Sequence, residues 1–82
     1  MQIVQKVLNT EILLNGTITA LAISDSGRYA ALGGSNGTIG VYCFEDKRSV
    51  CLMMIEHQVN CIDWAGPTLL AGDVEGSLHL FL

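Results

Sequence analysis

The segments YAALGGSNGTIGVY (residues 29–42) and TLLAGDVEGSLHLF (residues 68–81) align without a gap at an offset of 39 residues. Each contains two glycines four residues apart, followed by a small hydroxyl residue and an apolar stretch that ends on an aromatic side chain. The glycines that match are Gly33 and Gly37 in the first segment, which also contains Gly34 and Gly40, and Gly72 and Gly76 in the second. Self-similarity of this kind predicts one supersecondary unit that is used twice.

The similarity extends to the segments that precede these two. Residues 18–23 align with residues 59–64 at an offset of 41, and the same offset places residues 12–14 on residues 53–55. The matched pairs are Ile18 with Val59, Leu21 with Ile62, and Ile23 with Trp64. A period of about 40 residues made of four short strands is typical of a propeller blade.

The whole chain favours strands over helices. Segments rich in β-favouring residues recur between turns of glycine and small polar residues, and helical periodicity is hard to find. The expected strands are residues 10–14, 18–24, 29–33, 38–43, 49–55, 59–64, 68–71 and 77–82. Tight turns are expected at residues 25–28, 36–37 and 65–67, with a looser connection at 43–48. Residues 1–9 fit either a lead-in or an additional strand. The fold class expected is all-β, with two antiparallel blades.

Residues 10–82 resemble the WD40-repeat family, with one repeat at about 16–55 and a second at about 57–82. The resemblance rests on four consecutive features: an apolar first strand, a Ser-Asp-Ser-Gly turn, the motif Gly-x-x-x-Gly-Thr/Ser, and an apolar strand that ends on an aromatic residue. The family's Gly-His pair is replaced by Asn15-Gly16 and Glu56-His57, its turn aspartate by Asn36 and Glu75, and its Trp-Asp pair by Tyr42-Cys43 and Phe81-Leu82. The family's buried polar network is therefore incomplete, and at most His57 and Glu75 retain parts of it.

The resemblance implies a particular phase of the strands. With strands lettered a to d outward from the propeller axis, residues 10–14 form a strand d, residues 18–55 form abcd, and residues 59–82 form abc. Both faces of the first strand a, at residues 18–23, are expected to pack between blades. Propellers have about four to eight blades, so further blades in cis or in trans are expected as partners.

Composition and charge exclude several classes of function. The 82 residues carry eight acidic and four basic side chains, and Lys47-Arg48 is the one adjacent basic pair, so nucleic acid is not an expected partner. The longest uninterrupted apolar run, residues 50–55, is too short for a transmembrane helix, so membrane insertion is not expected. Three cysteines without CxxC spacing favour reduced thiols and a cytoplasmic protein, with the nucleus also open.

The candidate chemical groups favour structural roles. His57 and Cys61 lack the further ligands of a zinc site, and His79 is expected to be exposed or at a blade interface. Cys43, Cys51 and Cys61 are expected to be small core residues. The glycine-rich residues 32–38 lack the lysine and helix of a phosphate loop. No cofactor, metal or catalytic residue is expected, and a small enzyme on a β scaffold is kept as an alternative.

The resemblance implies a binding function for one set of turns. WD40 proteins bind protein partners on the face formed by the d-to-a and b-to-c turns, here residues 15–17, 34–36, 56–58 and 73–75. The candidate contact residues are Asn36, Glu56, His57, Gln58, Asp73 and Glu75. Because these turns contain carboxylates and no lysine or arginine, basic or polar protein segments are the expected partners. An alternative is that several copies of the chain assemble into a closed ring.

Overall fold

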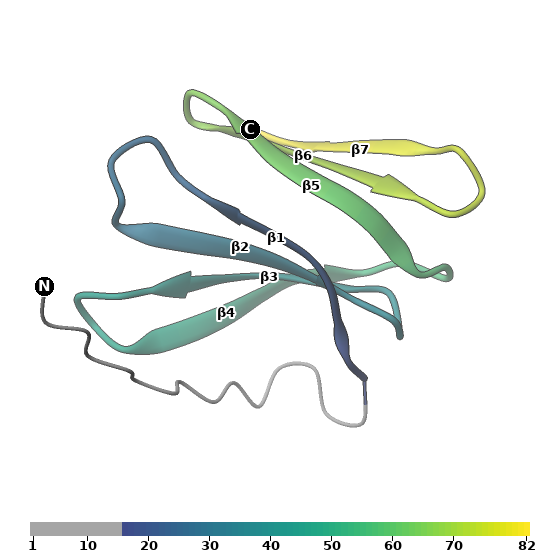
Figure 1. The fold of residues 1–82 in the computed structure, drawn as a ribbon, viewed down its shortest axis with the longest axis horizontal. Helices are drawn as coiled ribbons and strands as arrows, with labels where there is room; N and C mark the ends of the chain where they lie inside the picture. The colour runs from purple at the N-terminus through teal and green to yellow at the C-terminus, as the bar shows by residue number, and fades with distance from the viewer. Residues whose placement is uncertain (1–15) are drawn as a thin grey trace, which may run out of the picture.

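The computed structural model describes residues 16–82, which form two antiparallel sheets. The first sheet, blade 1, contains in order β1 (Ile18–Ile23), β2 (Tyr29–Gly34), β3 (Thr38–Cys43) and β4 (Arg48–Met54). The second, blade 2, contains β5 (Val59–Ala65), β6 (Thr68–Asp73) and β7 (Leu78–Phe81) (Figure 1). The all-β prediction and the abcd-abc phase are confirmed. The predicted strand at 10–14 and the lead-in at 1–9 lie outside the described residues.

The repeated glycines give the two blades the same central turn. Gly37, between β2 and β3, has φ 85°, and Gly76, between β6 and β7, has φ 86°. Each donates its amide hydrogen over 3.1 Å to the carbonyl three residues earlier, that of Gly34 or of Asp73. This left-handed backbone is readily adopted by glycine and disfavoured for other residues. The glycine spacing in the sequence therefore predicted both hairpins.

The repeat also includes an irregularity in the sheets. The β1–β2 register shifts between Ile18 and Ala20, and the β5–β6 register shifts between Val59 and Cys61. The offset of 41 equates these two places. A bulge of this type bends a strand locally and increases its twist, so both blades bend their innermost strand at the same point.

The core lies between the two blades, where β1 runs beside β5 (Figure 1). Ile39 of blade 1 and Val59 of blade 2 are completely buried there. Two hydrogen bonds cross between the blades: Thr19 Oγ1 donates to the Val59 carbonyl over 2.6 Å, and Trp64 Nε1 donates to the Ala22 carbonyl over 3.2 Å. Trp64, which aligns with the apolar Ile23, thus packs against the core at the junction of the blades.

Within residues 16–82 strand β1 packs on blade 2 through one face, while Leu21 and Ile23 on its other face are 59% and 53% exposed, where a further blade is expected. The prediction that the cysteines are core residues is wrong. The cysteines are free thiols outside the core, with Cys51 and Cys61 exposed and Cys43 half-buried. Because side chains alternate along a strand, the packing of Ile62 toward the core directs Cys61 to the opposite face.

Among residues 16–82 no helix is long and apolar enough to cross a membrane.

Candidate functional site

Four segments meet at one edge of the two blades, on the right in Figure 1. We call residues 16–17, 35–37, 55–58 and 74–76 the turn edge. Hydrogen bonds connect them: Ser35 N to the Thr17 carbonyl over 2.9 Å, Thr17 N to Ser35 Oγ over 3.0 Å, Ile55 N to the Gly37 carbonyl over 2.8 Å, and Val74 N to the Gln58 carbonyl over 3.1 Å. The predicted grouping of the d-to-a and b-to-c turns is therefore present in the described residues.

The turn edge is acidic. Glu56 and Glu75 are both exposed, and none of the residues defined above is a lysine or arginine. His57 Nδ1 lies 3.8 Å from Glu75 Oε1, with the two side chains 41% and 62% exposed. The basic residues of the described part of the chain lie instead at the opposite edge, in its turns and at the start of β4, together with Asp25, Glu45 and Asp46. Phe44 N donates to the Arg28 carbonyl there over 3.0 Å. Charge therefore differs between the two edges of the blades.

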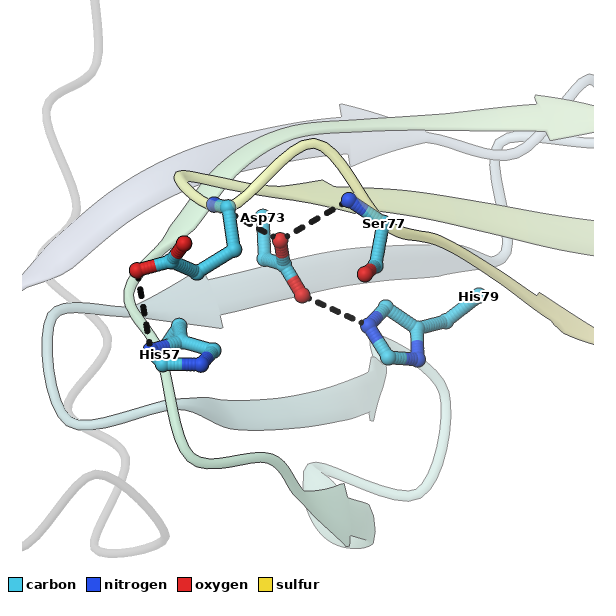
Figure 2. A network of polar contacts seen from close by, with 5 residues as sticks. His57, Asp73, Ser77 and His79 are labelled. Atoms are coloured by element: carbon cyan, nitrogen blue, oxygen red, sulfur yellow. Dashed lines mark hydrogen bonds and ion pairs between the residues drawn. The ribbon is translucent and has the colours of Figure 1, made fainter.

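Beneath the turn edge lies a buried carboxylate with three hydrogen-bond donors. Asp73 is 7% exposed. Its Oδ1 accepts the backbone amides of Glu75 over 2.9 Å and of Ser77 over 3.0 Å, and its Oδ2 accepts from His79 Nε2 over 2.9 Å. In Figure 2, dashed lines join this carboxylate to Ser77 and to His79. Because an ionised carboxylate only accepts hydrogen bonds, the His79 nitrogen is the donor.

The same contacts determine the protonation of Asp73. The hydrogen bond from His79 is the main cause that holds the pKa of Asp73 below its usual value, and the Ser77 amide acts in the same direction. Burial opposes them by disfavouring the charged form. The ionised carboxylate thus fixes the β6–β7 turn that displays Glu75.

The structure places the predicted histidines and carboxylates as follows. Asp73, a predicted contact residue, is buried with its carboxylate hydrogen-bonded in the β6–β7 turn. His79, expected to be exposed or at a blade interface, has a side chain that is 27% exposed and bonds to Asp73 within blade 2. The other candidates, Asn36, Glu56, Gln58 and Glu75, are exposed at the turn edge, and His57 is half-buried beside Glu75.

The Asp73–His79 contact was missed by sequence reasoning although a signal for it exists. Gly72 pairs with Leu78 in the β6–β7 hairpin, so Asp73 and Ser77 face each other where the hairpin turns. His79 lies two residues beyond Ser77, and residues two apart share a face of a strand. An aspartate before a glycine turn and a histidine shortly after it therefore predicts this pair once the register is known.

The opposite edge of the blades has a cleft. A largely apolar cleft of about 630 Å³ opens between the blades, with Val41, Val50 and Trp64 among its lining residues. Its carboxylate is Asp25, in an exposed turn. No group of three or more His, Cys, Asp or Glu side chains within the described part of the chain is placed to hold a metal ion. The buried carboxylate with three hydrogen-bond donors, that of Asp73, lies at the turn edge instead.

Comparison with family models and with curated proteins finds no match. Solved structures do match. A chain in the crystal structure of a mitotic checkpoint complex superimposes with a TM-score of 0.76 at 20% identity, over 82% of this chain and 21% of that one. The computationally designed protein Ika4 superimposes with a TM-score of 0.70 at 22% identity, over 78% of this chain and 39% of that one. Both neighbours are propeller-type structures. The fold is that of a β-propeller. This propeller segment spans less than half of either neighbour.

Proposed function

We propose that this propeller segment is a non-catalytic, cytoplasmic protein-interaction module of the WD40 type. It binds basic or polar protein segments through the turn edge. The observation that carries the proposal is the meeting of four segments at an edge that exposes Glu56 and Glu75 without a cation among them. The glycine hairpin that both blades share supports the WD40 assignment.

The geometry suits recognition of an extended chain. Glu56 precedes β5 and Glu75 lies in the β6–β7 turn, so the two carboxylates come from different segments that the Val74–Gln58 hydrogen bond holds together. A lysine or arginine side chain of a partner would replace the weak contact between Glu75 and His57, whose atoms are 3.8 Å apart. Asp73 orients the turn from below and makes no direct contact in this proposal.

The expected energetics are those of an exposed charged surface. Single exposed ion pairs contribute about 0–1 kcal/mol each, so binding requires several contacts at once. Charge complementarity of this kind mainly accelerates association and selects partners by sign. Binding is therefore expected to weaken as salt screens charges beyond about 8–10 Å.

A charge-reversal experiment tests the proposal. The probe is a fluorescent peptide of alternating lysine and serine, with a glutamate–serine peptide as the opposite-sign control, and binding is followed by anisotropy at low and high salt. We expect Glu56→Lys with Glu75→Lys to weaken binding of the basic peptide about tenfold or more, equivalent to about 1.4 kcal/mol. The matched control, Asp25→Lys with Glu45→Lys, makes the same charge change at the opposite edge and should retain binding. Equal loss in both double variants would show that net charge, and not the turn edge, attracts the peptide.

A further inference from the structure

Two apolar strand faces of this propeller segment are open, and they are independent of the turn edge. On β1, Ile18, Leu21 and Ile23 are 52%, 59% and 53% exposed. On β7, Leu78 and Leu80 are 62% and 55% exposed. Exposed aliphatic side chains gathered along a strand mark a surface that another protein surface covers.

The internal repeat identifies what covers the open face of β1. Its side chains Ile18, Leu21 and Ile23 correspond, at the offset of 41, to Val59, Ile62 and Trp64 of β5. Those three pack against blade 1, with Val59 completely buried and the other two half-buried. The same set of positions is thus buried in one copy of the repeat and exposed in the other.

The open face of β7 is likewise the equivalent of a face that is covered in blade 1, that of β3. Leu78 and Leu80 correspond, at the offset of 39, to Ile39 and Val41 of β3. Ile39 is completely buried and Val41 is packed against the same core. The open faces of β1 and β7 are therefore the repeat equivalents of the two surfaces that join blade 1 to blade 2.

We propose that a second copy of this chain covers these faces head to tail, with β1 of one copy packed on the outer face of blade 2 of the other. The contact repeats the blade 1–blade 2 interface between chains. Because it joins two different surfaces, it is a heterologous contact that closes into a ring when the rotation allows. Rings of about four to eight blades correspond to two, three or four copies.

The outer face of blade 2 has a hollow for the incoming strand, which the chain's own Cys61 partly fills beside Gly72 and which Asp63 also lines. Within the chain, a Cβ at Gly33 would collide with the side chain of Val59, so β5 approaches β2 closely at that glycine. Gly72 is the equivalent of Gly33, and Ile18 is the equivalent of Val59. A hollow of about 370 Å³ on this face includes Gly72 and Leu78 among its lining residues. Ile18 of the second copy occupies this hollow.

One polar contact also has an equivalent. Thr19 Oγ1 donates to the Val59 carbonyl across the existing interface over 2.6 Å. Asn60 stands at the position of Thr19 in the second repeat and is exposed. Its amide donates to the Ile18 carbonyl of the second copy. The interface between chains thus combines aliphatic packing with a hydrogen bond at the shared bulge.

The solution mass of the purified 82-residue chain, measured by light scattering with circular dichroism as a check on folding, tests the proposal. We expect a discrete particle of two, three or four times the 8.8 kDa of one chain. Leu21→Asp and Leu80→Asp each place a charge in the contact at a position exposed in the single chain, and each should weaken association roughly 100-fold or more. Val74→Asp changes a residue that is similarly exposed, at 51%, but lies in the β6–β7 turn, and should associate like the unaltered chain.

A mixing experiment distinguishes head-to-tail contact from other association. Leu21→Asp keeps an intact blade 2 face, and Leu80→Asp keeps an intact β1 face. Equal amounts of the two variants should therefore form a particle of two chains and no larger one, because one intact contact remains. A folded monomeric wild-type chain, an unfolded chain, undiminished association of either variant, or a mixture that stays monomeric would each overturn the proposal.

Discussion

The two blades share a backbone and differ in how they satisfy their polar groups. At the central turn, blade 1 has Gly34 and Gly40 where blade 2 has Asp73 and His79. The Asp73 carboxylate of blade 2 accepts three hydrogen bonds, whereas Gly34 at the equivalent position of blade 1 has no side chain to accept any. The repeat thus gives both turns the same backbone conformation, while different side chains make the hydrogen bonds of each turn.

In blade 1 the backbone amides of the central turn region are bonded by the neutral side chains of Asn36 and Ser35. Asn36 Oδ1 accepts the Thr38 amide over 3.2 Å, and Ser35 joins the turn to the start of β1. The Thr38 hydroxyl is buried and makes no hydrogen bond within residues 16–82. The turn of blade 1 is also covered by the connection that leads to blade 2, whereas the turn of blade 2 is open. Each of these differences can be tested by substitution.

The largest difference is expected between alanine substitutions at the two turn glycines. Alanine at a left-handed position is strained by about 1–2 kcal/mol, and this applies to both Gly37 and Gly76. A Cβ at Gly37 would also overlap the Ile55 carbonyl oxygen, whereas a Cβ at Gly76 would meet no atom within 4 Å. Gly37→Ala should therefore lose about 2 kcal/mol more unfolding free energy than Gly76→Ala, measured by urea denaturation. Equal losses in the two variants would show that the segment around Ile55, between β4 and β5, shifts away from the new Cβ with little loss of stability.

The next effect concerns Asp73 and acid. The pKa of Asp73 in the folded chain is lower than its ordinary value of 3.8, so the unfolded chain binds the proton more readily than the folded one. The ionised carboxylate therefore stabilises the folded chain above about pH 4, and this contribution is lost as the pH falls through the folded pKa. Asp73→Asn removes the charge, so its urea midpoint should lie below that of the wild type at pH 6. The two midpoints should converge as the pH falls through the folded pKa of Asp73. Asp25→Asn, in an exposed turn, is the control and should track the wild type over the same pH range.

The smallest effect, with the opposite sign, is expected at Thr38. Valine has a similar shape and removes a buried hydroxyl that has no partner in the described residues. Thr38→Val should raise the free energy of unfolding by about 0.5–1 kcal/mol, because the desolvated hydroxyl is no longer buried. Thr17→Val, at an exposed position, should change stability by less than about 0.5 kcal/mol. A clear loss of stability in Thr38→Val would reveal a partner for its hydroxyl.

The strands were predictable wherever glycine or proline defines a turn. The expected strand at 38–43 matches β3 at both ends. The strand expected at 68–71 instead continues to Asp73, because Asp73 pairs with Val59 and its carboxylate stabilises the turn that follows. Aspartate is depleted in strands, so propensity ended the strand too early. Tertiary hydrogen bonds decided this boundary.

The site was predictable in position but not in detail. The phase of the strands placed the turns of the turn edge together, since alternate hairpin turns of an antiparallel sheet lie at the same edge. The direction of each side chain depended on the register, which the sequence alone did not supply at Asp73 and His79. Cys51 and Cys61 were misplaced for a related reason, since an apolar strand has two faces and only one of them meets the other blade here.

Trp64 gives this chain an internal optical probe. It is the one tryptophan in the sequence, and its indole donates to the Ala22 carbonyl across the junction of the blades. Its fluorescence emission therefore reports the separation of the two sheets from each other, whereas far-ultraviolet dichroism reports the strands within each sheet. Recorded together, the two signals distinguish blades that part while still folded from blades that melt.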